Sequence, residues 1–61
     1  MVDLKDRRLL HGLSQSALAE LADVSLSLVR KVEYGQRKPS VKVAKKIAAV
    51  LQFDWTDFFK D

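Results

Sequence analysis

Apolar residues in this chain recur three and four positions apart in short blocks, and polar or glycine residues separate the blocks. That period places apolar side chains on one face of an α-helix. A half-buried strand needs strict alternation of apolar and polar residues, which no window of the sequence shows. We therefore expect an all-α fold. The expected helices span about residues 4–11, 15–22, 26–34, 41–51 and 55–59.

The ends of these helices follow from residues that cap or stop a helix. A serine precedes each of the second, third and fourth helices, and its hydroxyl can accept a hydrogen bond from a backbone N–H of the first turn. Glycine suits the left-handed residue that closes a helix, so Gly12 and Gly35 mark two helix ends. Pro39 interrupts the chain before the fourth helix, and Asp54 gives the last one an acidic start. The capping serines are Ser14, Ser25 and Ser40.

The apolar face of each helix predicts the core. In the last helix, Trp55, Phe58 and Phe59 supply aromatic bulk, and we expect at least two of these rings to be buried. Three rings exceed what one short helix needs, so we expect Trp55 or Phe59 to form part of a homodimer contact. The other side chains expected to point inward are Leu18, Leu21, Ala22, Val29, Val32, Ala44, Ile47, Ala48 and Leu51.

The size and composition of the chain exclude several classes of protein. Its 61 residues fit one small domain over residues 1–61, in which a ligand cavity would remove needed packing, so we expect no small-molecule ligand. The chain has no cysteine, so no disulfide or thiolate metal site supports the core, and we expect neither a metal nor a cofactor. The N-terminus is charged, and no run approaches the ~20 apolar residues of a membrane span. We expect a cytoplasmic protein.

Positive charge gathers in the middle of the chain, around two closely spaced helices. The net charge is +3, from 11 Lys and Arg against 8 Asp and Glu. A break of about three residues separates the second and third helices, which is the spacing of a helix-turn-helix. Ala19 is small enough for these helices to cross closely, and Val24 can fill the turn. The outer face of the third helix is then free to enter the major groove of duplex DNA, and it carries Ser25, Leu26, Ser27, Arg30 and Lys31.

Further residues follow in a fixed order from Leu4 to Phe59. They are Arg8, Gly12, Leu13, Ser14, Gln15, Leu18, Ala19, Val24, Ser25, Val29, Val32, Glu33, Gly35, Arg37, Pro39, Ser40, Ile47, Ala48, Leu51 and Phe58. In this order and without a gap, they resemble the phage repressor and Cro-like (Xre-type) helix-turn-helix family of bacterial and phage regulators. The resemblance implies a compact five-helix bundle of the lambda repressor-like type and a transcriptional regulator, a repressor that binds a palindromic operator as a homodimer.

The same resemblance implies a role for particular positions. Phosphate contacts position and strengthen such a complex, whereas base contacts select the sequence. The implied phosphate contacts are Gln15, Ser16, Arg37 and Lys38. The implied base contacts are Leu26, Ser27 and Lys31, with Ser25 and Arg30 beside them. Arg8 and Glu33 correspond to a partly buried ion pair between the first and third helices. Lys42, Lys45 and Lys46 either extend the DNA-contacting surface or form a solvated helix face, which is the ordinary explanation.

Three departures from the family pattern affect what can be transferred. Asp23 occupies a turn position where glycine is usual, and Asp tolerates left-handed geometry better than most residues. Arg7 stands where an apolar residue is usual, so either its stem runs along the core edge or the register there is off by one. Leu26 and Leu28 lie where polar residues are common, and they either touch thymine methyl groups or pack against neighbouring side chains.

A second function remains open. Domains of this fold also serve as protein-interaction modules, as in antitoxins, and an exposed apolar patch around Leu26 and Leu28, or around Phe59, would favour that role. We do not expect an enzyme, since the sequence offers no nucleophile with a base, no phosphate-binding glycine loop and no cluster of metal ligands. His11, in the last turn of a helix, is expected only to complement the helix dipole.

Overall fold

A computed structural model describes residues 2–60, and this part of the chain contains four α-helices, one terminal 3₁₀ helix and no strand. The all-α prediction is confirmed. The prediction of five helices is only partly right, because the last segment is a short 3₁₀ helix with tighter i→i+3 turns. The elements are α1 (Leu4–Leu10), α2 (Gln15–Ala22), α3 (Leu26–Glu33), α4 (Val41–Leu51) and η1 (Trp55–Phe59). His11 and Tyr34, expected as the last residues of two helices, are instead their C-caps.

Each predicted N-cap forms a hydrogen bond with the first turn of its helix. Ser14 Oγ accepts from the Ala17 N–H at 3.0 Å, and Ser25 Oγ accepts from the Leu28 N–H at the same distance. Such a cap satisfies one of the backbone donors that a helix start leaves without a partner. Ser40 and Asp54 cap α4 and η1 in the same way, and Asp3, which the sequence analysis missed, caps α1.

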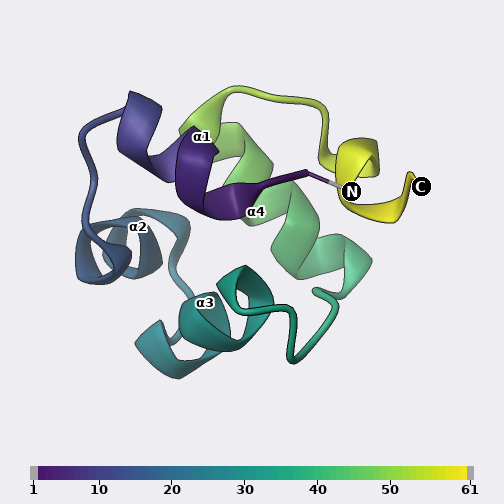
Figure 1. The fold of residues 1–61 in the computed structure, drawn as a ribbon, viewed down its shortest axis with the longest axis horizontal. Coiled ribbons are helices and arrows are strands. Elements are labelled where there is room, and N and C mark those ends of the chain that lie inside the picture. The colour runs from purple at the N-terminus through teal and green to yellow at the C-terminus, as the bar shows by residue number, and fades with distance from the viewer. Residues whose placement is uncertain (1, 61) are drawn as a thin grey trace.

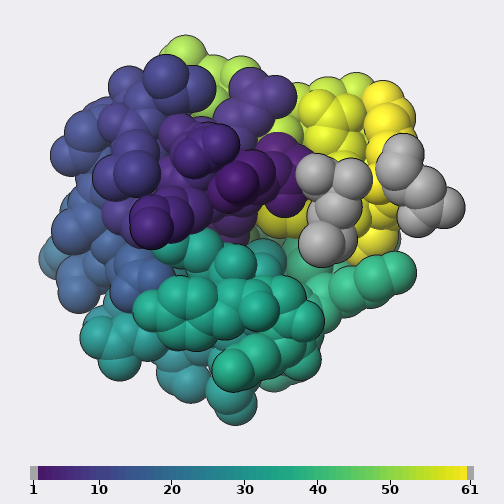
Figure 2. Space-filling model, viewed as in Figure 1, coloured from purple at the N-terminus to yellow at the C-terminus, as the bar shows by residue number. Residues whose placement is uncertain are grey.

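The helices surround one core, and α3 lies at its edge. In Figure 1, α1 crosses in front of α4, α2 and α3 lie on one side, and η1 packs on α4 at the other side, near the start of the chain. The largest fully buried side chains are Leu18, Val29, Ile47 and Leu51. Figure 2 shows that α3 and the loop after it, in teal, form the lower face of the molecule in this view. Within residues 2–60, no helix is long and apolar enough to cross a membrane.

Leu21 corrects the predicted core. It was expected to be buried but is 62% exposed. In α2 the buried residues are Leu18, Ala19 and Ala22. At about 100° per residue, these three occupy one arc of the helix, and Leu21 lies outside it, beyond Leu18. The side on which α3 and α4 pack decides this orientation, and the spacing of the apolar residues alone leaves two choices.

The aromatic residues correct a second prediction. Only Phe58 of the three rings in η1 is buried; Trp55 is half-buried and Phe59 is 41% exposed, so the expectation of two buried rings is wrong. Phe53, in the loop before η1, fills part of the space, with its ring centroid 5.3 Å from that of Phe58. Lys45 lies over the ring of Trp55, 5.1 Å from its centroid, and covers it from solvent.

Candidate nucleic-acid interface

The turn between α2 and α3 sets the crossing of these two helices. Asp23 ends α2 with φ 55° and ψ 49°, in the left-handed region, as the sequence analysis expected of an Asp in this position. The Val24 N–H then donates to the Ala19 carbonyl at 3.0 Å, which closes the turn. Val24 is half-buried against the core. The turn thereby directs the start of α3 away from α2 while keeping the two helices in contact.

α3 is anchored by few side chains and leaves a broad outer face. Val29 is its only buried residue, at 0% exposure, and Leu26 and Val32 are partly buried against the core. Successive residues advance by about 100° around a helix, so the positions opposite Val29 must face solvent. The exposed residues of α3 and its two caps are Ser25, Ser27, Arg30, Lys31 and Tyr34. Leu26 and Leu28 are half-buried, which favours the packing alternative raised for them.

The ion pair between Arg8 and Glu33 holds α3 against α1. Arg8 Nε donates to Glu33 Oε2 at 3.0 Å, and Nη2 donates to Oε1 at 2.7 Å, so the contact is bidentate. The third donor, Nη1, reaches the Leu13 carbonyl at 2.9 Å. Both side chains are nearly buried, at 9% and 3% exposure. The hydrogen bond with Glu33 raises the pKa of Arg8 further above its already high ordinary value, against the lowering effect of burial.

A second polar cluster joins the start of α2 to the outer face of α3. Arg30 Nε donates to Gln15 Oε1 at 3.5 Å, and Gln15 Nε2 donates to the Tyr34 hydroxyl at 3.3 Å. Gln15 therefore uses both ends of its amide on side chains of α3. Tyr34 was not among the residues expected at the site, because in the sequence it looks like an ordinary helix end. Its spacing of four residues from Arg30 was the signal that could have found it, because residues four apart share a helix face.

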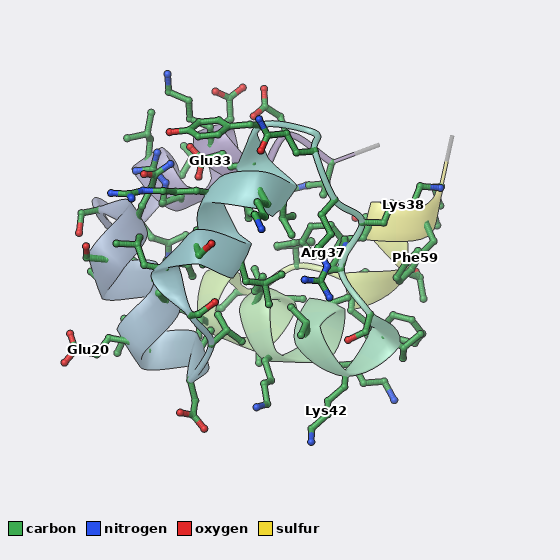
Figure 3. The ribbon with its side chains drawn as sticks, turned by 90° about the horizontal axis from the view of Figure 1, so that it is seen from below. Glu20, Glu33, Arg37, Lys38, Lys42 and Phe59 are labelled. Carbon is green, nitrogen blue, oxygen red and sulfur yellow. The ribbon has the colours of Figure 1, made fainter. Side chains whose placement is uncertain are left out.

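The loop after α3 carries two more cations. The Gln36 and Arg37 N–H groups both donate to the Lys31 carbonyl, at 2.8 and 3.3 Å, and Gly35 has a φ of 75°. Pro39 is buried, so the loop is fixed at its far end as well. Arg37 and Lys38 are exposed and lie on opposite sides of the loop in Figure 3. The two predicted phosphate contacts therefore leave the loop in different directions, although both border the same surface hollow.

A surface hollow of about 390 Å³ lies beside this loop, between the N-terminal segment, the end of α3 and η1. Leu4, Pro39 and Phe58 supply apolar walls, and Arg37 and Lys38 line it as cations. Within residues 2–60, no three His, Cys, Asp or Glu side chains are grouped so that they could hold a metal ion. The chemistry on this side of the molecule is that of an exposed, positively charged helix and loop.

Comparison with known proteins identifies the family. The helix-turn-helix family profile matches residues 4–58, which is most of the chain. This chain belongs to the helix-turn-helix family. The finding confirms the resemblance drawn from the sequence. A curated relative from Bacillus subtilis (strain 168), described as the uncharacterized HTH-type transcriptional regulator YqaF, is 47% identical over 58 residues, covering 95% of this chain and 76% of the relative. No solved structure matches the chain.

Within the helix-turn-helix fold, the residues expected at a dimer contact lie far from α2. Trp55 and Phe59 meet edge to face, with ring centroids 6.1 Å apart, and Figure 3 shows Phe59 on the opposite side of the molecule from Glu20. Arg7 lies over the ring of Phe53, 5.2 Å from its centroid. Of the two alternatives raised for Arg7, this contact supports a side chain that runs along the core edge in the expected register.

Proposed function

We propose that this helix-turn-helix protein is a sequence-specific regulator that binds duplex DNA with α3 in the major groove. The observation that carries the proposal is the outer face of α3, which is exposed and basic although both Val29 and the Arg8–Glu33 pair fix the helix in place. The description of the relative as a transcriptional regulator supports the same reading. Family and relative both point to a protein that is not an enzyme, and we propose that it acts in the bacterial cytoplasm.

The exposed residues divide into two proposed roles. Ser25, Ser27 and Lys31 lie where side chains of a helix in the groove meet base edges, and Leu26 contributes only its exposed part. Hydrogen bonds from lysine or arginine to guanine, and from serine to any base, provide the sequence choice. The proposed phosphate contacts are Gln15, Ser16, Arg37 and Lys38, which supply affinity that depends on salt.

A homodimer completes the proposal. One domain of this size has little area for specific binding, and two copies on half-sites about one helical turn apart double the contact. Phe59, at 41% exposure, offers apolar surface beside Trp55 on the α4–η1 side, and Val41, at 49%, lies at the start of α4. We propose that a second copy covers this surface, so that the protein represses by occupying a palindromic operator. Sedimentation that shows only monomer at high micromolar concentration would rule out the dimer.

Selection of bound sequences from a random duplex pool tests the function. Near physiological salt, nonspecific binding is weak and a true site is enriched. We expect a palindrome whose half-sites are centred about 10 base pairs apart. Enrichment of a single half-site would support sequence-specific DNA binding and contradict the homodimer. Absence of any enriched sequence would contradict both and favour the second candidate function.

Matched substitutions test the division of roles. Lys31→Ala should relax the preference at one base pair, because it removes a proposed base contact. Arg37→Ala should weaken binding to all duplexes alike and make the salt dependence shallower by about one unit of slope. Affinities for the selected site and for single-base variants of it, measured over a salt series, separate the two. A uniform loss in both variants would show that Lys31 does not read bases.

The second candidate is a protein-interaction module. The patch that would have favoured it around Leu26 and Leu28 is not exposed, since both residues are half-buried. The other expected position, Phe59, is 41% exposed, and further apolar surface lies on α1, where Leu10 is 81% exposed and Leu9 is 54% exposed, beside Asp6. A chain that selects no duplex but loses a partner in the Leu10→Lys variant would be assigned to this class.

A further inference from the structure

Gln15 forms hydrogen bonds with Arg30 and Tyr34, two side chains that are not among the base and phosphate contacts proposed above. Its carbonyl oxygen accepts from Arg30 Nε at 3.5 Å, and its amide nitrogen donates to the Tyr34 hydroxyl at 3.3 Å. Gln15 is the first residue of α2, so these bonds draw Arg30 toward the start of α2. The resemblance placed Arg30 beside the base contacts, and this cluster gives its guanidinium a direction.

The outward residues of α3 and its C-cap form two rows. Arg30 and Tyr34 are exposed and share one face with the half-buried Leu26, each four residues from the next, whereas the exposed Ser27 and Lys31 share the neighbouring face. Only the first row meets Gln15. In helix-turn-helix complexes the first helix of the pair crosses the sugar-phosphate backbone while the second lies in the groove. A side chain of α3 that is held at the start of α2 therefore lies close to the sugar-phosphate backbone of the DNA. It lies beside the major groove and not over the base edges.

We propose that Gln15, Arg30 and Tyr34 form a clamp for the DNA backbone, in which the Arg30 guanidinium binds a phosphate and the other two hold it in place. Arg30 uses Nε on Gln15 and keeps both terminal amino groups for a phosphate, the forked geometry that guanidinium offers to such anions. Tyr34, which is 61% exposed, is a positioning residue. The inference rests on the proposed function and moves Arg30 from sequence choice to affinity.

Three variants separate the parts of the clamp. Arg30→Ala removes the charge, Arg30→Lys keeps the charge but loses the Nε bond to Gln15, and Tyr34→Phe keeps the ring and loses the hydroxyl. Lys5→Ala is the matched control, because Lys5 is an exposed cation on α1. All three positions are exposed, so the helical circular dichroism and the thermal midpoint of the four variants should match those of the unchanged chain. Binding is measured by fluorescence anisotropy between about 50 and 200 mM salt, a range over which phosphate contacts weaken strongly.

The expected results follow from counterion release. Arg30→Ala should weaken binding to the selected site and to an unrelated duplex by the same factor, about tenfold, and make the slope of log affinity against log salt shallower by about 0.9. Arg30→Lys and Tyr34→Phe should each lose about two- to threefold in affinity with no change in slope, because the charge remains. Lys5→Ala should change neither quantity by more than about twofold.

Three outcomes overturn the proposal. A changed preference at one base pair in Arg30→Ala would show that Arg30 reads bases. An Arg30→Ala variant that behaves like Lys5→Ala would show that its charge acts only through the general field. Absence of duplex binding by the unchanged chain, even at the lowest salt, would overturn the proposed function and the clamp with it. The first two leave DNA binding by the unchanged chain intact, so failure of the clamp and failure of the function are distinguishable.

Discussion

α2 and α3 have the same length and the same kind of N-cap, but they are held in place by different means. Each has eight residues and begins after a serine. Three residues of α2 are buried in the core, whereas Val29 is the only buried residue of α3. The second anchor of α3 is polar, the bond from Glu33 at its end to Arg8. A helix anchored by one fully buried side chain, two partly buried ones and one ion pair keeps its outer face free for a partner.

The two anchors also differ in what they specify. Apolar burial is non-directional, so Leu18 and its neighbours give α2 stability more than orientation. The bidentate Arg8–Glu33 pair has a fixed planar geometry, and it sets the rotation of α3 about its own axis. That rotation decides which residues of α3 face outward. The polar anchor therefore matters most where the outer face has a function.

Breaking the polar anchor should have the largest effect. Glu33→Ala leaves the nearly buried Arg8 guanidinium without its counter-charge, and loss of one partner of a buried pair costs about 3–5 kcal/mol. A domain of this length has roughly 0.05–0.15 kcal/mol of stability per residue, so the variant should lose a large part of its free energy of unfolding. Urea denaturation followed by circular dichroism measures the loss.

A double variant is the control for that measurement. Arg8→Met together with Glu33→Leu replaces the pair by apolar side chains of similar volume and should recover stability to within about 1 kcal/mol of the unchanged chain, because it buries no lone charge. A loss below about 1 kcal/mol in Glu33→Ala alone would mean that solvent reaches Arg8 and that α3 does not depend on the pair.

Weakening the apolar anchor should have the next largest effect. Leu18 is fully buried in α2, and Leu18→Ala should cost about 3 kcal/mol through lost burial and the cavity left behind. Leu21→Ala, in the same helix, removes the same atoms from a side chain that is 62% exposed and should cost under about 0.5 kcal/mol. Denaturant midpoints of the two variants give the comparison, and equal losses would contradict the orientation of α2.

The turn between the two helices should show the smallest effect, and a gain. Asp23 has a φ of 55°, and glycine adopts this conformation without the penalty of a Cβ, so Asp23→Gly should stabilise the protein by about 0.5–1 kcal/mol. The melting temperature should rise by roughly 3–6 °C. Gly35→Ala is the opposite control: its Cβ would meet open space but its φ is 75°, so stability should fall. A loss in Asp23→Gly would indicate that its 4.0 Å contact with Lys46 outweighs the strain.

The sequence predicted the parts of the fold that depend on neighbours in the chain. Ser14, Ser25 and Ser40 cap helices through groups three residues away, and Asp23 takes a backbone conformation that its own side chain tolerates. The burial of a given side chain depends on where other helices pack. For that reason the predicted inward orientation of Leu21 was wrong.

The same limit applies to the candidate site. The Arg8–Glu33 pair was expected from a resemblance, since the two residues are 25 positions apart and no local rule connects them. Tyr34 was missed because its contact with Gln15 depends on the angle at which α2 and α3 cross. The exposed residues of α3 followed from helix periodicity once Val29 was placed inward. The distances between side chains of α2 and α3 across the turn could not be predicted from the sequence.

The Arg8–Glu33 bond also bears on the order of events in folding. Each helix cap closes within three residues, whereas this bond joins positions 25 apart. Closing the longer loop costs chain entropy before the bond can repay it, so we expect the bond to form after the transition state, once α3 has docked. Substitution of Glu33 should then accelerate unfolding far more than it slows folding, as a chevron plot would show. The ion pair would thus form late in folding and slow unfolding, so that it sets how long α3 stays docked with its outer face exposed.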